Sequence, residues 1–98
     1  MTITNERNND QLTIAIEGRL DTTTAPQLEK FLSENTDGVK DIVIDMAKLE
    51  YISSAGLRVL LAAHKKMSKT GTLKLVNVCD EIMEVFDMTG FSDILDIE

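Results

Sequence analysis

Side chains that commonly perform catalysis or bind metals are scarce in this sequence. Its 98 residues include one cysteine, Cys79, one histidine, His64, and no tryptophan, and aromatic residues make up 4% of the chain. A single cysteine cannot form a disulfide within the chain, which fits a reducing compartment. With so few aromatic residues, the core must be built mainly from Leu, Ile, Val and Met. We expect Cys79, which has no second cysteine nearby, to be a small buried residue.

Positive charge is also in short supply. The chain has 10 Lys and Arg against 17 Asp and Glu, a formal net charge of −7, and its basic residues form no long run. Nucleic acids and anionic membranes attract basic proteins, so we expect neither as the main partner. Solubility explains the acidity, with a basic face on a protein partner as the alternative. The N-terminus lacks the apolar segment of a secretory signal, and no apolar run is long enough to span a bilayer, so we expect a soluble cytoplasmic protein.

The sequence contains no recognisable catalytic or metal-binding pattern. His64 lies ten residues after Ser54 in a predicted helix, about 15 Å along the helix axis, which is too far for proton transfer between them. The carboxylates are dispersed, and the glycines occur singly at predicted loops and helix ends rather than in a phosphate-binding loop. We therefore expect that the protein is not an enzyme and that it binds neither a cofactor nor a metal ion.

Hydrophobic periodicity predicts an α/β protein with a single domain over residues 1–98. Alternating apolar residues such as Leu12, Ile14 and Ile16 indicate a half-buried strand, whereas the nearly continuous apolar run after Asp41 indicates a central strand. The predicted strands cover residues 3–7, 11–18, 41–46, 72–78 and 94–97. The predicted helices follow Thr24 up to residue 35, run from residue 54 or 55 to residue 69, and cover residues 80–87. This order predicts a mixed central β-sheet of about five strands with helices packed mainly on one face.

Local signals suggest how the first and third helices begin. Thr24 and Gln27 have the spacing of a capping box, with Thr24 as N-cap, and Asp80 is the expected cap of the third helix. Four large apolar side chains near the C-terminus are expected in the core rather than at an interface: Met83, Phe86, Met88 and Phe91. Exposed edges of the predicted sheet would permit weak self-association, so we expect a monomer or a weak dimer.

Two serines stand between the central strand and the second helix. Ser53 and Ser54 begin a run of small residues that ends at Gly56, at the point where the chain enters a helix. A helix N-terminus has unpaired N–H groups and a positive dipole end, so it tolerates an added phosphate. One interpretation is simple helix capping by serine. The other is a contact surface, in which small residues expose backbone for the close approach of another protein.

Three motifs together resemble the STAS domain family, most closely its stand-alone anti-sigma factor antagonists. The motifs span residues 17–21, residues 45–57 and residues 85–91, and the resemblance covers essentially the whole chain. It implies a partner switch, in which the unphosphorylated antagonist binds an anti-sigma factor that is itself a serine-protein kinase. Phosphorylation of a serine at the helix start ends binding, and a serine phosphatase of the PP2C type restores it.

The resemblance also implies which residues carry the switch. Anchored on Gly56, the phosphorylated serine is Ser54, and Asp21 is the loop carboxylate beside it. Well-studied phosphorylated members have Asp directly before the target serine, where this chain has Ser53, so Ser53 is the alternative target. The implied partner-binding face comprises Asp21, Thr22, Thr23, Ser53, Ser54, Ala55, Gly56, Leu57 and Arg58.

Two other functions are compatible with these residues. A STAS subunit of a transport complex, of the lipid-trafficking type, would dock constitutively through the same face and need no kinase. A small-ligand sensor or an enzyme would instead be stabilised by its ligand.

Overall fold

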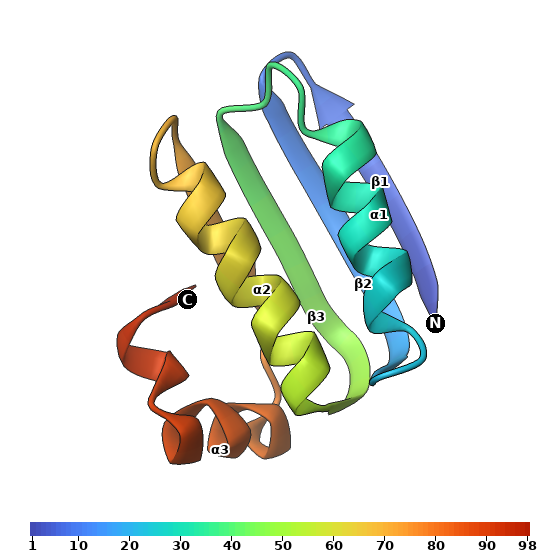
Figure 1. Ribbon diagram of the computed structural model, residues 1–98, viewed down its shortest axis with the longest axis vertical. Coiled ribbons are helices and arrows are strands. Elements are labelled where there is room, and N and C mark those ends of the chain that lie inside the picture. Colours follow the sequence, from blue (N-terminus) through green and yellow to red (C-terminus); the bar gives the residue numbers. More distant parts are fainter.

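The computed structural model describes residues 1–98 and has the predicted order of elements, strand-strand-helix-strand-helix-strand-helix-strand (Figure 1). The strands are β1 (Thr2–Asn8), β2 (Gln11–Leu20), β3 (Asp41–Ile52), β4 (Thr72–Val76) and β5 (Asp96–Ile97). The helices are α1 (Ala25–Asn35), α2 (Ser54–Met67) and α3 (Asp80–Thr89), and a 3₁₀ helix (Phe91–Asp93) precedes β5.

The five strands form one mixed sheet in the order β1-β2-β3-β4-β5. β1 is antiparallel to β2, and every other pair of neighbours is parallel. Parallel neighbours need a connection that crosses from one end of the sheet to the other, and α1, α2 and α3 supply these connections. Figure 1 shows α1 and α2 side by side on one face, with α3 at one end of the sheet. The predicted α/β class and mixed sheet are confirmed.

The core lies between the sheet and these helices and is aliphatic, as the composition requires. Alternate residues of β2 are buried, as predicted for Leu12, Ile14 and Ile16, and they pack in one cluster with helix residues such as Leu28 and Leu60. The core contains no buried polar or charged residue. Phe86 of α3 is its one aromatic member.

β3 is longer than predicted because its hydrophobic pattern changes along its length. Up to Met46 every second residue is buried, but the next buried residues, Leu49 and Ile52, follow at intervals of three. The register between β2 and β3 shifts twice in this part, so β3 has two more residues than β2 over the paired length. Such bulges move successive inward side chains off the period of two. The prediction that the strand ends at residue 46 was therefore wrong.

Thr24 occupies the predicted N-cap position of α1, but the hydrogen bonds of the predicted capping box are absent. Thr24 precedes α1 but has helical backbone angles, and its side chain makes no capping hydrogen bond. Gln27 does not reach back to it; the Gln27 side-chain amide instead donates to the Met1 carbonyl at 3.2 Å. Residues of the preceding loop compete for the Thr24 hydroxyl, as described below.

Three predictions for the C-terminal part also need correction. Cys79 is exposed rather than buried, and it occupies the N-cap position of α3, so Asp80 is the first helical residue and not the cap. Met88 is 86% exposed, because it lies on the outer side of α3 from the buried Ile82 and Phe86.

Several predicted ends move by a few residues. α2 ends at Met67 rather than at residue 69, and α3 extends to Thr89. β4 ends at Val76 because the backbone of Asn77 has φ +57°, which is incompatible with a strand. The last strand is reduced to two residues, since the chain before it forms the 3₁₀ helix. None of the helices is both long and apolar enough to cross a membrane.

Candidate functional site

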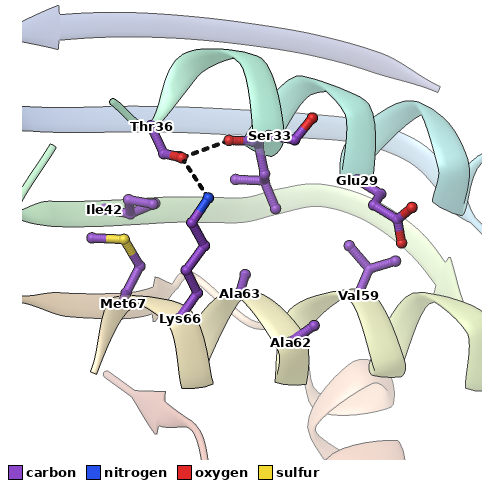
Figure 2. Close-up of a pocket in the computed structure, with 10 residues that line it drawn as sticks. Glu29, Ser33, Thr36, Ile42, Val59, Ala62, Ala63, Lys66 and Met67 are labelled. Carbon is purple, nitrogen blue, oxygen red and sulfur yellow. Dashed lines mark hydrogen bonds between the residues drawn. The ribbon is translucent and has the colours of Figure 1, made fainter. Parts of the chain in front are cut away.

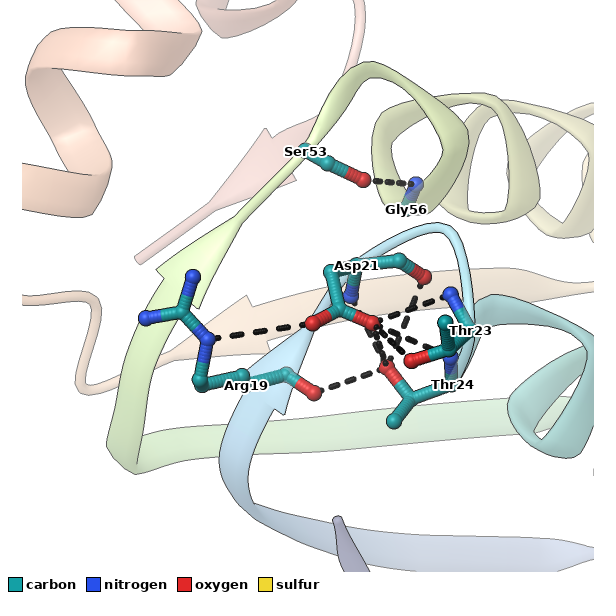
Figure 3. Close-up of polar contacts among 6 residues, drawn as sticks. All are labelled: Arg19, Asp21, Thr23, Thr24, Ser53 and Gly56. Atoms are coloured by element: carbon teal, nitrogen blue, oxygen red, sulfur yellow. Dashed lines mark hydrogen bonds and ion pairs between the residues drawn. The ribbon is translucent and has the colours of Figure 1, made fainter.

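The predicted site residues meet at one edge of the sheet, where β2 and β3 end. These strands are parallel, so their carboxyl ends lie together, and Leu20 is paired with Ile52. Ser53, the residue that follows β3, donates its backbone N–H to the Leu20 carbonyl at 2.9 Å. The loop that begins at Asp21 therefore lies directly beside the start of α2 (Figure 3).

Ser53 is the N-cap of α2. Its backbone is extended (φ −99°, ψ 174°), and its hydroxyl accepts a hydrogen bond from the Gly56 N–H at 3.4 Å. Its carbonyl accepts the first helical bond, from the Leu57 N–H at 3.0 Å. Ser53 is half-buried, so both its hydroxyl and its carbonyl are used to begin the helix.

Ser54 is the first residue of α2 and differs from Ser53 in its exposure and in the hydrogen bonding of its hydroxyl. It is exposed, and its hydroxyl has no hydrogen-bond partner within the chain. It stands at the positive end of the helix dipole, and α2 has no acidic residue in its first turn. Of the two serines, Ser54 has the accessible and uncommitted hydroxyl.

Asp21 organises the loop between β2 and α1. One of its carboxylate oxygens, Oδ1, accepts hydrogen bonds from the Thr23 hydroxyl at 2.7 Å, the Thr23 N–H at 3.0 Å and the Thr24 N–H at 3.1 Å. The bond from the Thr23 hydroxyl contributes most, and together these bonds lower the pKa of the Asp21 carboxyl because they stabilise its charged form. Asp21 therefore stays negatively charged at neutral pH.

Thr24 closes the same loop. Its hydroxyl accepts from the Asp21 N–H at 2.8 Å and donates to the Arg19 carbonyl at 2.8 Å. These bonds explain why Thr24 does not cap α1. They also hold the backbone of Asp21 to Thr24 in one conformation beside α2.

Gly56 is buried and points toward the strands, which corrects its interpretation as exposed backbone. A Cβ atom at this position would lie 2.7 Å from Leu20 Cγ and 3.0 Å from Ile52 Cγ1. The first turn of α2 thus packs so closely on the ends of β2 and β3 that only glycine fits without movement. The neighbouring Leu57 is 5% exposed and belongs to the core.

The nine residues of the implied partner-binding face are adjacent in the fold but differ in exposure. Arg58, Thr22, Thr23 and Ser54 are exposed; Asp21, Ser53 and Ala55 are half-buried; Gly56 and Leu57 are buried. The accessible surface therefore consists of the loop and the outer side of the first turn of α2, with Gly56 and Leu57 beneath it.

One neighbouring feature was missed by the sequence reasoning. The guanidinium carbon of Arg19 lies 4.2 Å from the centre of the Tyr51 ring, and Arg19 Nε is 3.7 Å from Asp21 Oδ2. Tyr51 is 41% exposed. Both residues lie inside the motifs that were singled out, but only the register of β2 on β3 pairs them across the sheet.

The structure brings no catalytic constellation to this site. His64 lies in the third turn of α2, and its Nδ1 atom is buried without a hydrogen-bond partner. No three His, Cys, Asp or Glu side chains are grouped closely enough to hold a metal ion. The chemistry that this edge offers is a free hydroxyl on a helix N-terminus, next to a fixed carboxylate.

Comparison with known proteins identifies relatives over nearly the whole length of the chain. A model of the STAS domain family matches residues 2–98. BtrV of Bordetella bronchiseptica is 34% identical, over 99% of this chain and 85% of that protein. The anti-sigma-B factor antagonist of Bacillus subtilis is 32% identical, over 94% of this chain and 85% of that protein.

A solved structure has the same fold. The crystal structure of an anti-sigma factor antagonist from Mycobacterium paratuberculosis superposes with a TM-score of 0.87 at 25% sequence identity. The superposition covers 98% of this chain and 83% of that one.

Proposed function

This chain belongs to the STAS domain family, and we propose that it acts as an anti-sigma factor antagonist that is switched by phosphorylation of Ser54. The names of its relatives support the antagonist role, since a protein 32% identical to it is an anti-sigma-B factor antagonist. The proposed role is regulatory rather than catalytic. It belongs in the cytoplasm, where sigma factors direct transcription.

The proposed cycle has two partners. The unphosphorylated chain binds an anti-sigma factor that is also a serine-protein kinase, and the sigma factor is thereby released. The kinase then transfers a phosphate to Ser54, which ends binding. A serine phosphatase of the PP2C type removes the phosphate and restores the binding form.

The observation that carries the choice of residue is the different use of the two hydroxyls. Ser53 Oγ is committed to the Gly56 N–H, whereas Ser54 is exposed and has no partner within the chain. A kinase must reach the hydroxyl oxygen and remove its proton, which is easier for Ser54. The family's Asp before the target serine corresponds to Ser53, and Asp and Ser are both good N-cap residues. Ser53 can therefore replace that Asp without loss of the helix start.

The local charges support a change in binding without a change in fold. A phosphate carries about −1.5 to −2 charge at pH 7, and a helix N-terminus stabilises negative charge by about 0.3–1 kcal/mol. Arg58 is exposed four residues after Ser54, a spacing at which helical side chains pair. Within the domain, the phosphate is thus accommodated.

Across an interface the same phosphate is unfavourable. It would add charge beside Asp21, whose carboxylate is held in its charged form by the loop. If facing a carboxylate or an apolar patch of the partner costs about 4 kcal/mol, the Kd rises about a thousandfold, from nanomolar to micromolar. We propose that the contact surface is formed by the accessible residues of the implied face, with Gly56 and Leu57 supporting it from below.

The test is the mass of the protein purified from its native cells with phosphatases inhibited, with fragment mapping of any modification. We expect one phosphate on Ser54, retained in Ser53→Ala and absent from Ser54→Ala. Ser54→Ala should still bind the anti-sigma factor. Phosphate on Ser53 in the wild type would reassign the site. A chain that stays unmodified under every growth condition would overturn the switch and favour constitutive docking on a transport complex.

A further inference from the structure

A cleft separates α1 from α2 on the helical face of the sheet, away from the Ser54 hydroxyl. It has a volume of about 150 Å³ and is lined mainly by apolar side chains, including Leu32, Ile42, Val59 and Met67 (Figure 2). An enclosed apolar cavity of about this volume, engineered in another protein, binds benzene. The cleft is therefore large enough for the body of a small aromatic or branched aliphatic molecule.

The cleft contains one cation without a carboxylate partner. Lys66 Nζ lies 3.4 Å from Thr36 Oγ1 and takes part in neither of the ion pairs in the structure, which join Arg19 to Asp21 and Lys74 to Glu98. In an acidic chain an ammonium without a carboxylate neighbour is available to an external anion. Figure 2 shows the Lys66 side chain extending across the cleft from α2 toward Thr36 on α1.

The hydroxyls of the cleft leave Lys66 as the principal hydrogen-bond donor for a ligand. The Thr36 hydroxyl donates to the Leu32 carbonyl at 2.7 Å, and the Ser33 hydroxyl donates to the Lys30 carbonyl at 3.0 Å. Lys66 has three N–H groups, of which Thr36 accepts one. Two remain for a carboxylate.

The negative charge of Glu29 determines which way round an anionic ligand would lie in the cleft. Glu29 also lines the cleft, and Figure 2 places it near Val59, at the end remote from Lys66 and Thr36. An anionic group is repelled from Glu29 and attracted to Lys66. The apolar part of such a ligand then lies between α1 and α2, along Val59 and Ala62.

We propose that the cleft between α1 and α2 binds a small apolar carboxylate of about the size of benzoate, with its carboxylate on Lys66. This site is separate from the proposed phosphorylation site and does not depend on any protein partner. It adjoins the partner-binding face, because a second hollow lined by Thr22, Ala55 and Arg58 shares Glu29, Val59 and Ala62 with the cleft.

The test is titration of the isotope-labelled domain with benzoate, followed by amide NMR shifts. Saturable shifts are expected for residues of the cleft, such as Ser33, Ala62 and Ala63. Lys66→Met keeps the apolar stem but removes the charge and should weaken benzoate binding about tenfold, the value of one charged hydrogen bond. Lys65→Met removes an exposed charge one residue away and should leave the affinity unchanged. Benzamide, which has nearly the same shape without the charge, should bind the wild type about as weakly as benzoate binds Lys66→Met.

A cleft-filling variant provides an independent check. Ala63→Leu places three more carbons in the cleft and should abolish the saturable shifts, with native circular dichroism showing that the fold is kept. The proposal is overturned if benzoate produces no saturable shifts in the wild type, or if Lys66→Met and Lys65→Met bind it equally well. Either result would leave the partner switch at Ser54 untouched, since that switch is measured with a kinase and not with a small ligand.

Discussion

Replacing each of the two adjacent serines with alanine should have opposite consequences. Ser53→Ala removes the N-cap of α2 and leaves the Gly56 N–H without its acceptor. Loss of a serine cap costs about 0.5–2 kcal/mol, and the 3.4 Å separation of Ser53 Oγ and Gly56 N places this case toward the lower half, about 1 kcal/mol. Ser54→Ala removes an exposed hydroxyl without a partner and should change the free energy of unfolding by less than about 0.5 kcal/mol.

Thermal and urea unfolding of the purified variants measure this difference. For a domain of this size, about 1 kcal/mol corresponds to a fall in Tm of about 4–8 °C. Ser53→Ala should show this fall, and the Tm of Ser54→Ala should differ from that of the wild type by less than about 2–4 °C. Ser53→Asp is the matched control, because aspartate restores a cap and should recover most of the lost stability.

Phosphate incorporation in the native cells then distinguishes the serine that caps α2 from the serine that accepts the phosphate. Ser53→Ala should still be phosphorylated, whereas Ser54→Ala should not. If Ser54→Ala were the less stable variant, or if Ser53→Ala lost labelling while remaining folded, the assignment of the two hydroxyls would be refuted.

Three further changes test the surroundings of the switch. Gly56→Ala would gain about 1 kcal/mol from helix propensity, but its Cβ would overlap Leu20 Cγ at 2.7 Å, and overpacking costs about 1–3 kcal/mol. We expect a lower urea midpoint, and a more stable variant would contradict the close packing of α2. Ser54→Asp should keep native circular dichroism but weaken binding to the anti-sigma factor at least about tenfold, measured by calorimetry; unchanged affinity would argue against the electrostatic mechanism. Asp21 has a pKa lowered chiefly by the Thr23 hydroxyl, so its stabilising effect is complete above the unfolded-state pKa of about 3.9 and is lost as the pH falls through the lower folded-state pKa. Asp21→Asn should therefore be less stable than the wild type at pH 7, and the gap should close in acid; a gap independent of pH would contradict this role.

Much of the fold could be read from the sequence because its signals are local. Alternation in β2, helical spacing in α2 and the order of elements together give an α/β sheet with crossover helices, and all of these are present. The two main errors have identifiable structural causes. The bulges in β3 end the alternation of buried and exposed residues after Met46. The Thr24 hydroxyl accepts from the Asp21 N–H in the preceding loop and therefore does not cap α1.

Exposure was harder to predict than secondary structure. Cys79 and Met88 were expected inside because their side chains are apolar, but Cys79 falls at a helix start and Met88 on the outer side of a short helix. Gly56 shows the reverse error: its small size suggested exposed backbone, yet it is buried where the first turn of α2 packs on Leu20 and Ile52. Hydrophobicity and size alone do not specify which side of an element faces the core.

Composition, periodicity and short motifs were sufficient to predict the fold class, the STAS family and the position of two serines at a helix start. Which hydroxyl is free became clear from the three-dimensional structure, in which the Ser53 hydroxyl accepts from the Gly56 N–H and Ser54 is exposed. The structure also shows that Asp21 lies beside the two serines, because Leu20 and Ile52 are paired in parallel strands. It shows too that Lys66 lines a cleft. The last two relations join residues 30 or more positions apart in the chain, and only packing of the sheet and helices brings such residues into contact.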